Sequence, residues 1–264
     1  MTDASRGQSS QLLSGKHAVV TGGSRGIGAA IVEMLLAHGA RVTSVSRTDT
    51  TNRSGTPESR NALNQVAADI TDPESVKKAF ESARGRFGQI AILVNNAGQA
   101  ASAPFFKTDA ALWRKMMAVN VDGTFHCTQA ALAGMLAAGW GRIVNIASTA
   151  GLVGYPYVTA YCAAKHGVVG LTRALALEVA TKGVTVNAVC PGFTDTDIVK
   201  DAVANIVAKT GRTAEQAQAE LASRNPQKRL LRPEEVGNAV VWLCLPGSDS
   251  ITGQTIAVAG GEVM

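Results

Sequence analysis

Three side chains in the middle of the sequence have the types and the spacing that proton transfer requires. Tyr161 and Lys165 lie four residues apart at the start of an Ala-rich amphipathic segment. Four residues are one helical turn, so both side chains share a face with a rise of roughly 6 Å. Ser148 ends the apolar run that begins at Ile143. A phenol, an ammonium and a hydroxyl held together could donate a proton to a developing oxyanion and stabilise it.

The elements that must position these residues alternate between strands and helices. Short apolar runs that end at glycine or polar residues predict the strands, and longer segments with helical periodicity predict the helices. This alternation predicts an α/β fold with a single doubly wound Rossmann domain, in which helices flank a mainly seven-stranded parallel sheet. The expected strands are 17–21, 41–46, 65–69, 90–94, 142–147, 184–189 and 255–258, and the expected helices are 27–38, 72–87, 108–139 (one or two), 160–181 and 233–245.

The chain has 264 residues and no composition break that would divide it into two domains. We expect a flexible N-terminal tail over residues 1–14 and one domain over residues 15–264. Residues 48–61 are polar and turn-rich, which indicates a loop or a short, poor helix. The long, polar and charged stretch at about 193–232 is expected to be a loop, and loops of this length are usually functional or mobile.

Composition excludes several classes of function. The net charge of +5 is spread along the chain without a Lys/Arg block, which argues against a nucleic-acid-binding protein. The four cysteines have neither metal-binding nor redox-motif spacing, so we expect reduced thiols and no metal site. The N-terminus has no apolar signal-peptide region, and no apolar run reaches the ~18 residues that a membrane helix needs. We therefore expect a cytoplasmic protein with no membrane partner.

A glycine-rich turn follows the first expected strand and opens the first expected helix. Gly22, Gly26 and Gly28 have the spacing G-x-x-x-G-x-G, with Ser24, Arg25 and Ile27 between them. Glycines permit a tight turn and a close approach to a pyrophosphate, and the helix start directs N–H groups at the phosphates. A glycine triplet is a weak signal alone, but this strand–turn–helix context predicts a dinucleotide site.

The end of the second expected strand indicates which dinucleotide binds. An acidic residue about 20 positions after the glycine loop would bind the ribose 2′-hydroxyl of NAD. Ser46 occupies that position, followed by Arg47, and Arg25 lies in the glycine loop. These groups suit a 2′-phosphate, which favours NADP(H) over NAD(H), although Asp49 lies near. Asp69 and Ile70 could frame the adenine; Asp69 could instead be a helix N-cap.

Six motifs in order make the chain resemble the short-chain dehydrogenase/reductase family from about Leu13 to the C-terminus. The motifs are TGGSRGIG at 21–28, NNAG at 95–98, AVNVDGTF around Asn120, IVNIAS ending at Ser148, YCAAK at 161–165 and CPG at 190–192. The resemblance implies that Asn120, Ser148, Tyr161 and Lys165 form a catalytic tetrad. It implies cofactor contacts from Asn96, Ala97 and Gly98, from Tyr161 and Lys165, and from Pro191, Gly192 and Thr196, the last three at the nicotinamide carboxamide.

The expected chemistry is hydride transfer with Tyr161 as acid and base. Tyrosine has a pKa near 10, and the Lys165 ammonium is expected to lower it. Ser148 would hold the carbonyl, and Asn120 would hold a water in a proton relay, as the resemblance implies. Each residue alone could instead have a packing, capping or solvated role. His166, on a different face from Lys165, is expected to pack rather than to act as a base.

The substrate is less determined than the reaction. The C-terminal sequence and the block around Tyr161 look most like family members that act on 3-oxoacyl or 3-hydroxyacyl thioesters, including 3-hydroxyacyl-CoA dehydrogenases. Arg224, Lys228, Arg229 and Arg232 could meet the phosphates of coenzyme A or a phosphopantetheine carrier, or form a solvated surface. The alternatives are a ketoreductase for a free cyclic, aromatic or polyketide ketone, and a non-catalytic NADP sensor. The resemblance also implies that residues 193–232 cover the substrate as a lid, and that the chain forms a homotetramer packed through long helices.

Overall fold

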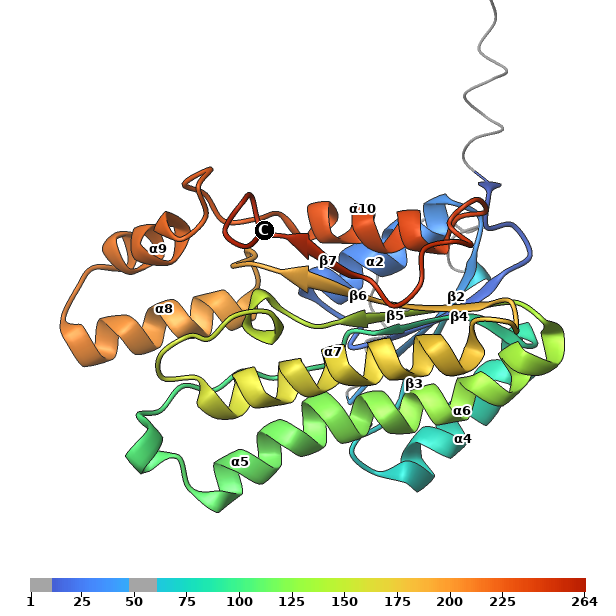
Figure 1. The fold of residues 1–264 in the computed structure, drawn as a ribbon, viewed down its shortest axis with the longest axis horizontal. Helices are drawn as coiled ribbons and strands as arrows, with labels where there is room; N and C mark the ends of the chain where they lie inside the picture. Colours follow the sequence, from blue (N-terminus) through green and yellow to red (C-terminus); the bar gives the residue numbers. More distant parts are fainter. Residues whose placement is uncertain (1–10, 48–60) are drawn as a thin grey trace, which may run out of the picture.

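The computed structural model describes residues 11–47 and 61–264. Seven parallel strands form one sheet in the order β3-β2-β1-β4-β5-β6-β7. This order, with helices on both faces, confirms the predicted doubly wound fold (Figure 1). The strands are β1 (His17–Thr21), β2 (Arg41–Ser46), β3 (Leu63–Ala67), β4 (Ile90–Asn95), β5 (Gly141–Ile146), β6 (Val184–Pro191) and β7 (Thr255–Val258).

The core forms two apolar layers, one on each face of the sheet. Helices α2 (Gly26–Ala37) and α10 (Pro233–Cys244) pack on one face, and α4 (Pro73–Phe87), α6 (Gly123–Ala138) and α7 (Thr159–Val179) cover the other (Figure 1). Every residue of β1, β5 and β6 is buried. Strands covered on both faces read as continuous apolar runs, which is why the sequence signal for them is strong.

Parallel strands bring their carboxyl ends to one edge of the sheet, where open α/β folds bind ligands. The glycine turn follows β1, Asn96 and Gly98 follow β4, Ser148 follows β5, and Gly192 follows β6. These four segments therefore lie at one edge of the sheet, although they are far apart in the sequence.

The stretch 193–232 differs from the expected polar loop. It forms α8 (Asp197–Thr210) and α9 (Ala214–Ser223), which project beyond the end of the sheet (Figure 1). Val199 and Val203 are one turn apart, and the Thr213 side chain caps α9 in a capping box with Gln216. These two signals were present in the sequence; the high polar content of the segment masked them.

Smaller differences concern element boundaries. Leu13 is fully buried and its N–H bonds the His38 carbonyl at 2.9 Å, so the expected tail of residues 1–14 is wrong at its C-terminal end. Strand β3 begins two residues before the prediction and ends before Asp69. The expected loop or helix at 48–61 lies, except for its last residue, outside the described part of the chain.

The expected helix at 108–139 is one nearly continuous helical segment that contains an irregular turn. Helix α5 (Ala110–Met117) leads into a π-helical turn, η3 (Ala118–Asp122), and then into α6. A π turn shifts the hydrogen-bond ladder by one residue and often marks a functional position. The residue at the centre of this turn is Asn120.

Candidate active site

The glycine turn is shaped by close packing against the end of β4. Gly22 has a φ of 65°, and its N–H bonds the Val45 carbonyl at 2.7 Å. A Cβ at Gly22 would lie 2.9 Å from the Cα of Ala97, and a Cβ at Gly28 would overlap the Gly22 carbonyl oxygen. Side chains are therefore excluded at both positions, and Ala97 forms part of the turn's wall.

Asn96 fixes this turn from the side. Its Nδ2 donates to the carbonyl oxygens of Thr21 (2.9 Å) and Gly22 (3.1 Å). The Thr21 hydroxyl accepts from the backbone N–H groups of Asn96 and Ala97, both at 3.0 Å. The resemblance placed Asn96 beside the cofactor ribose; the geometry adds a role in holding the phosphate-binding turn.

The start of α2 fits a pyrophosphate. No side-chain hydrogen bond caps its first turn, and that turn contains no acidic residue. The amides of a helix start need partners outside the helix, and they carry the positive end of its dipole. By contrast, Asp72 caps α4 and Asp109 caps α5. The chain thus leaves open the helix start that anion binding would require.

The residues at the end of β2 have only some of the features expected of a 2′-phosphate site. Ser46 pairs with Ala67, and exposed Arg47 is near enough to Asp69 to contribute to its lowered pKa. The larger cause of that lowering is hydrogen bonding from Thr71, at 2.9 Å from its N–H and 2.8 Å from its hydroxyl. Asp69 is exposed and is not a helix cap, so that alternative is wrong.

Three more of the predicted cofactor residues have defined neighbours in the fold. The side chain of Ile70 is buried against Gly123 at the start of α6. Arg25 forms an exposed ion pair with Asp197, in the first turn of α8, at 3.2 Å. Thr196 also lies against the glycine turn, because a Cβ at Gly26 would be 3.1 Å from its methyl carbon. The predicted phosphate loop and the predicted carboxamide loop therefore meet.

The structure brings Ser148, Tyr161 and Lys165 together at the carboxyl edge of the sheet. The side chains of Ser148 and Tyr161 are hydrogen-bonded, and the Ser148 hydroxyl also accepts from the Ala150 N–H at 3.1 Å. Lys165 is 5% exposed, and its Nζ donates to the Ile146 carbonyl at 2.8 Å. The same Nζ lies 5.7 Å from the centroid of the Tyr161 ring.

The ionisation of these groups differs from the expectation in one respect. Burial raises the pKa of Tyr161 to about 12, against the opposing effect of the Ser148 hydrogen bond. Burial also lowers the pKa of Lys165 to about 8. The expected lowering of the tyrosine pKa by Lys165 is therefore wrong: burial is the largest cause of the shift, and the Lys165 ammonium donates to the Ile146 carbonyl instead. Near neutral pH Tyr161 is a phenol, which is the form that donates a proton.

The Asn120 side chain lies against Gly98 and is hydrogen-bonded to the backbone of the next residue, Gln99. Its Nδ2 donates to the carbonyls of Gln99 (3.0 Å) and Met116 (2.9 Å), and its Oδ1 accepts from the Gln99 N–H at 3.3 Å. A Cβ at Gly98 would lie 2.8 Å from Asn120 Oδ1 and 3.5 Å from Lys165 Nζ. Because Gly98 has no side chain, the side chains of Asn120 and Lys165 can both lie close to its backbone.

A network of buried polar side chains connects the strands and helices around the site, and it was not predicted from the sequence. Asn95 Nδ2 donates to Thr128 Oγ1 at 3.0 Å and to Asn145 Oδ1 at 2.8 Å, and Asn145 Nδ2 donates to Thr172 Oγ1 at 2.9 Å. The network ties β4 and β5 to α6 and α7. Its sequence signal was an asparagine at the end of one strand, β4, and another within its neighbour, β5.

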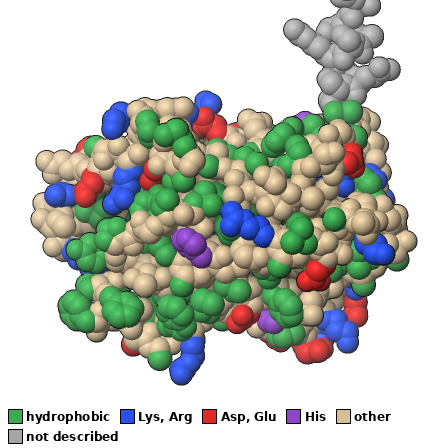
Figure 2. Space-filling view, in the orientation of Figure 1, with side chains coloured by type: hydrophobic (Ala, Val, Ile, Leu, Met, Phe, Trp, Pro, Cys, Tyr) green, Lys and Arg blue, Asp and Glu red, His purple; other side chains and the backbone are tan. Residues whose placement is uncertain are grey.

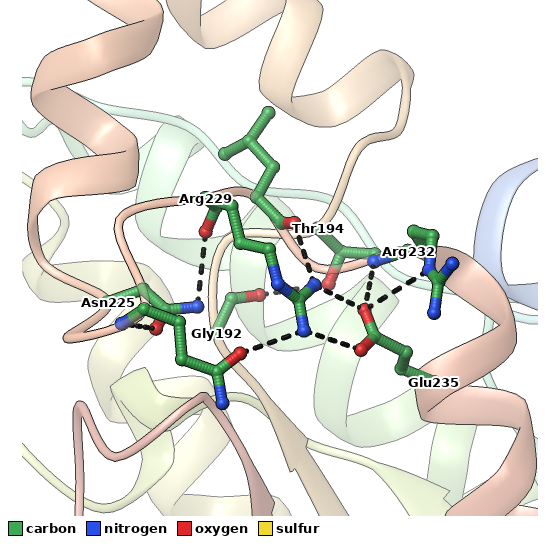
Figure 3. A network of polar contacts seen from close by, with 8 residues as sticks. Gly192, Thr194, Asn225, Arg229, Arg232 and Glu235 are labelled. Carbon is green, nitrogen blue, oxygen red and sulfur yellow. Dashed lines mark hydrogen bonds and ion pairs between the residues drawn. The ribbon is translucent and has the colours of Figure 1, made fainter.

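Three of the four residues of the expected basic cluster make contacts within the protein. Arg229 makes two 2.7 Å hydrogen bonds to the Glu235 carboxylate, and Arg232 Nε lies 3.7 Å from it (Figure 3). The Arg229 hydrogen bonds are the main cause of a Glu235 pKa near 2. Lys228 donates to the Ser223 carbonyl at 2.9 Å. A phosphate-binding role for Arg229 and Arg232 is therefore disfavoured, and Arg224 is the one of the four that no such bond occupies among the described residues.

Asn225 ties this lid segment to the C-terminal turn. Its Nδ2 donates to the Arg229 carbonyl at 3.1 Å, and a Cβ at Gly260 would overlap the Asn225 side chain. Thr194, whose hydroxyl donates to the Gly192 carbonyl at 3.0 Å, pairs with Leu231 (Figure 3). The loop after β6, the lid and the C-terminal turn therefore form one packed unit.

A groove of about 520 Å³ runs between α8 and α9. Apolar side chains form most of its lining, which consists of Asp195, Val199, Lys200, Val203, Ala204, Val207, Ala208, Ala214, Gln218 and Leu230. Within the described ranges, no three His, Cys, Asp or Glu side chains are grouped to hold a metal ion. No helix in those ranges is long and apolar enough to cross a membrane.

Comparisons with known proteins agree with this geometry. The family model described as short chain dehydrogenase matches residues 16–207. The chain is 38% identical over 256 residues to 3-oxoacyl-acyl-carrier-protein reductase FabG of Vibrio cholerae, covering 96% of this chain and 99% of that protein. It is 37% identical over 259 residues to D-beta-hydroxybutyrate dehydrogenase of Rhizobium meliloti, covering 93% and 98%.

A solved structure is similar as well. The structure of a variant of actinorhodin polyketide ketoreductase with NADPH superposes with a TM-score of 0.89 at 35% identity, covering 95% of this chain and 98% of that one. Family and relatives together make this chain an oxidoreductase that acts on a CH–OH or C=O group. The chain belongs to the short-chain dehydrogenase/reductase family.

Proposed function

We propose that the chain interconverts a 3-oxoacyl thioester, carried by coenzyme A or an acyl carrier, and its 3-hydroxyacyl form with NADP(H). The observation that carries the proposal is the hydrogen-bonded pair of Ser148 and Tyr161, beside buried Lys165. This group lies at the same sheet edge as the uncapped start of α2. Proton donor and dinucleotide site thus adjoin each other.

In the reducing direction, bound NADPH would supply a hydride to the carbonyl carbon, and the electron pair of the C=O π bond would move to the oxygen, leaving it as an alkoxide. Tyr161 then donates its phenolic proton to the alkoxide oxygen. Ser148 donates a hydrogen bond to the same oxygen and holds it against the phenol. Lys165 contributes a positive charge that stabilises the tyrosinate left behind. Asn120, through Gln99 and Gly98, keeps the wall of the site in place.

The choice of a thioester rests on the relatives. A reductase of 3-oxoacyl groups on acyl carrier protein is 38% identical to this chain over nearly its whole length. The groove between α8 and α9 has room and apolar lining for an acyl chain. Exposed Arg224 remains available to an anionic carrier group.

The preference for NADP(H) rests on the residues after β2. No carboxylate stands at Ser46, and Arg47 and Arg25 supply two guanidiniums. A carboxylate at the strand end would repel a 2′-phosphate, whereas guanidiniums bind one. The NADPH in the similar ketoreductase structure supports the same choice.

A second candidate substrate is a free cyclic, aromatic or polyketide ketone. It is favoured by the similarity to a polyketide ketoreductase at a TM-score of 0.89. The same tyrosine chemistry would serve both substrates, so the difference lies in the lid.

A screen of NADPH oxidation discriminates these possibilities. The substrates are acetoacetyl-CoA, longer 3-oxoacyl-CoAs and a set of cyclic ketones, each measured with NADPH and with NADH. We expect the highest kcat/KM for a thioester with NADPH. Turnover of cyclic ketones alone would select the second candidate, and equal efficiency with NADH would overturn the cofactor assignment. A failure to oxidise NADPH with any ketone would instead point to an NADP sensor without catalytic activity.

We also propose a homotetramer packed through its long helices. Large apolar side chains are exposed on α6 and α7, with Leu177 at 82%, Phe125 at 45% and Leu136 at 38%. Such residues on neighbouring helices are typical of an interface between copies. Light scattering on the purified chain tests the mass, and a monomer would contradict the proposal.

A further inference from the structure

A second polar cluster lies beside the proposed catalytic residues. Glu262 follows β7 in a turn where Gly260 and Gly261 have φ values of 60° and 92°. The turn places the carboxylate against Gly192, so that a Cβ on Gly192 would lie 2.9 Å from Oε2. Gly192 is in the loop after β6 to which the sequence assigns the reacting end of the cofactor.

Tyr155 connects this carboxylate to the catalytic serine. The Tyr155 hydroxyl donates to Glu262 Oε1 at 2.8 Å, and Tyr155 is also hydrogen-bonded to the side chain of Thr149. Thr149 is buried and directly follows Ser148. Glu262 is thus connected to the proposed site through two side chains and the backbone of one residue.

The other carboxylate oxygen, Oε2, is left without a partner by the described residues. Oε2 of Glu262 is buried and accepts no hydrogen bond from any residue that the structure describes. Leaving a buried carboxylate oxygen unsatisfied is unfavourable, so such an atom calls for a donor from outside the chain. The nearby guanidinium of Arg224 lies 5.1 Å from the Tyr155 ring centroid in an exposed residue, so positive charge lies at the surface of this cluster.

We propose that Glu262 is a specificity-determining residue, whose Oε2 accepts a hydrogen bond from a hydroxyl, amide or ammonium donor of the substrate. The same charge repels a substrate with a free carboxylate near the reacting carbonyl. This inference rests on the proposed carbonyl reduction and deepens it, because it distinguishes thioesters and esters of 3-oxo acids from the free acids. Tyr155 holds the carboxylate in position through Oε1 and leaves Oε2, next to Gly192, without a donor among the described residues.

The test compares ethyl acetoacetate with acetoacetate, a neutral and an anionic ketone of the same skeleton. Like charges placed together at a recognition site disfavour the wrong ligand strongly, so we expect the wild-type kcat/KM to be at least about 50-fold higher for the ester. Glu262→Gln keeps the size of the side chain and removes its charge. We expect it to reduce that ratio at least about tenfold, mainly through a lower KM for acetoacetate.

Matched controls separate this role from a structural one. Glu234→Gln removes a charge from an exposed position of α10 and should leave the ratio unchanged. Tyr155→Phe removes the donor to Oε1 but retains the charge, so discrimination against acetoacetate should persist. A Glu262→Gln ratio equal to that of the wild type would overturn the inference.

Measurements on the wild-type protein alone also test the proposed role of Glu262. If Glu262→Gln does not fold, equal wild-type efficiency with ester and free acid would still overturn the role of Glu262. If the wild type reduces neither of these nor any thioester, the proposed function itself fails and the inference falls with it. Turnover of the neutral ketone with an unchanged ratio would remove only the inference.

Discussion

At the scale of single residues, the central finding is that the phenol of Tyr161 and the ammonium of Lys165 lie within one helical turn, with Lys165 Nζ 5.7 Å from the Tyr161 ring centroid. Lys165 is held by the Ile146 carbonyl at 2.8 Å, and burial keeps Tyr161 protonated. The spacing predicted a shared helix face correctly. It could not predict the direction of the pKa shift, because that depends on how completely the surrounding strands and loops exclude water.

Replacing the hydroxyl of Tyr161 removes the proton donor without disturbing the glycine turn. We expect Tyr161→Phe to retain NADPH binding and to lose over ~99% of turnover, which corresponds to about 3 kcal/mol or more in the barrier. Steady-state kinetics and a fluorescence titration with NADPH measure the two effects. Tyr157→Phe is the matched control, because Tyr157 is 64% exposed and should tolerate the change. Activity near the wild-type level in Tyr161→Phe would remove the assigned role.

The pH profile of the reduction should report Lys165. Its pKa is lowered to about 8 by burial, so the side chain is charged below that pH and neutral above it. The tyrosinate that forms during the reaction then loses its stabilising cation, and kcat/KM should fall as pH rises through about 8. The Tyr161 phenol, with a pKa of about 12, stays protonated over this range. A profile that is flat between neutrality and pH 10 would contradict this assignment.

At the scale of elements, the sequence correctly predicted the strands and helices that have clear local signals. It missed the elements that depend on tertiary contacts. β1 and β2 match the predicted bounds, because both lie between clear turn signals. Helices α8 and α9 were predicted as loop, because the polar residues of a half-exposed lid dilute the apolar spacing. The π turn at Asn120 has no such local signal; it follows from packing of the α5–α6 segment against Gly98 and Gln99.

Asp197, in the first turn of α8, would compete with a 2′-phosphate for Arg25. Asp197 pairs with this guanidinium at 3.2 Å, and a 2′-phosphate would need the same group. We expect Asp197→Asn to tighten NADPH binding by a few-fold, since exposed ion pairs are worth at most about 1 kcal/mol, and to leave NADH binding unchanged. Dissociation constants for both dinucleotides measure this. Asp201→Asn, an exposed position of the same helix, is the control, and an equal effect from both variants would show a general charge effect instead.

At the scale of the whole molecule, the fold joins distant parts of the chain by a few buried polar contacts. His17, at the start of β1, bonds the Gly88 carbonyl and the Thr43 hydroxyl, both at 2.9 Å. Arg142, fully buried at the start of β5, bonds Asp249 at 2.5 Å and lies 4.4 Å from the Trp140 ring. A single sequence shows only that such residues interrupt apolar runs. Their partners are 71 and 107 positions away and depend on the assembled sheet.

His17 gives the fold a predictable sensitivity to acid. Burial is the main cause that lowers its pKa below 6.5 in the native state, whereas the unfolded chain titrates near the ordinary value. As pH falls through about 6.5, the unfolded state gains a proton that the native state does not bind, so the free energy of unfolding decreases until the native pKa is passed. Urea unfolding at a series of pH values from 7.5 to 5 measures the slope. His17→Gln should flatten it, whereas His166→Gln, at an exposed position, should not; an unchanged slope in His17→Gln would assign the acid sensitivity to other groups.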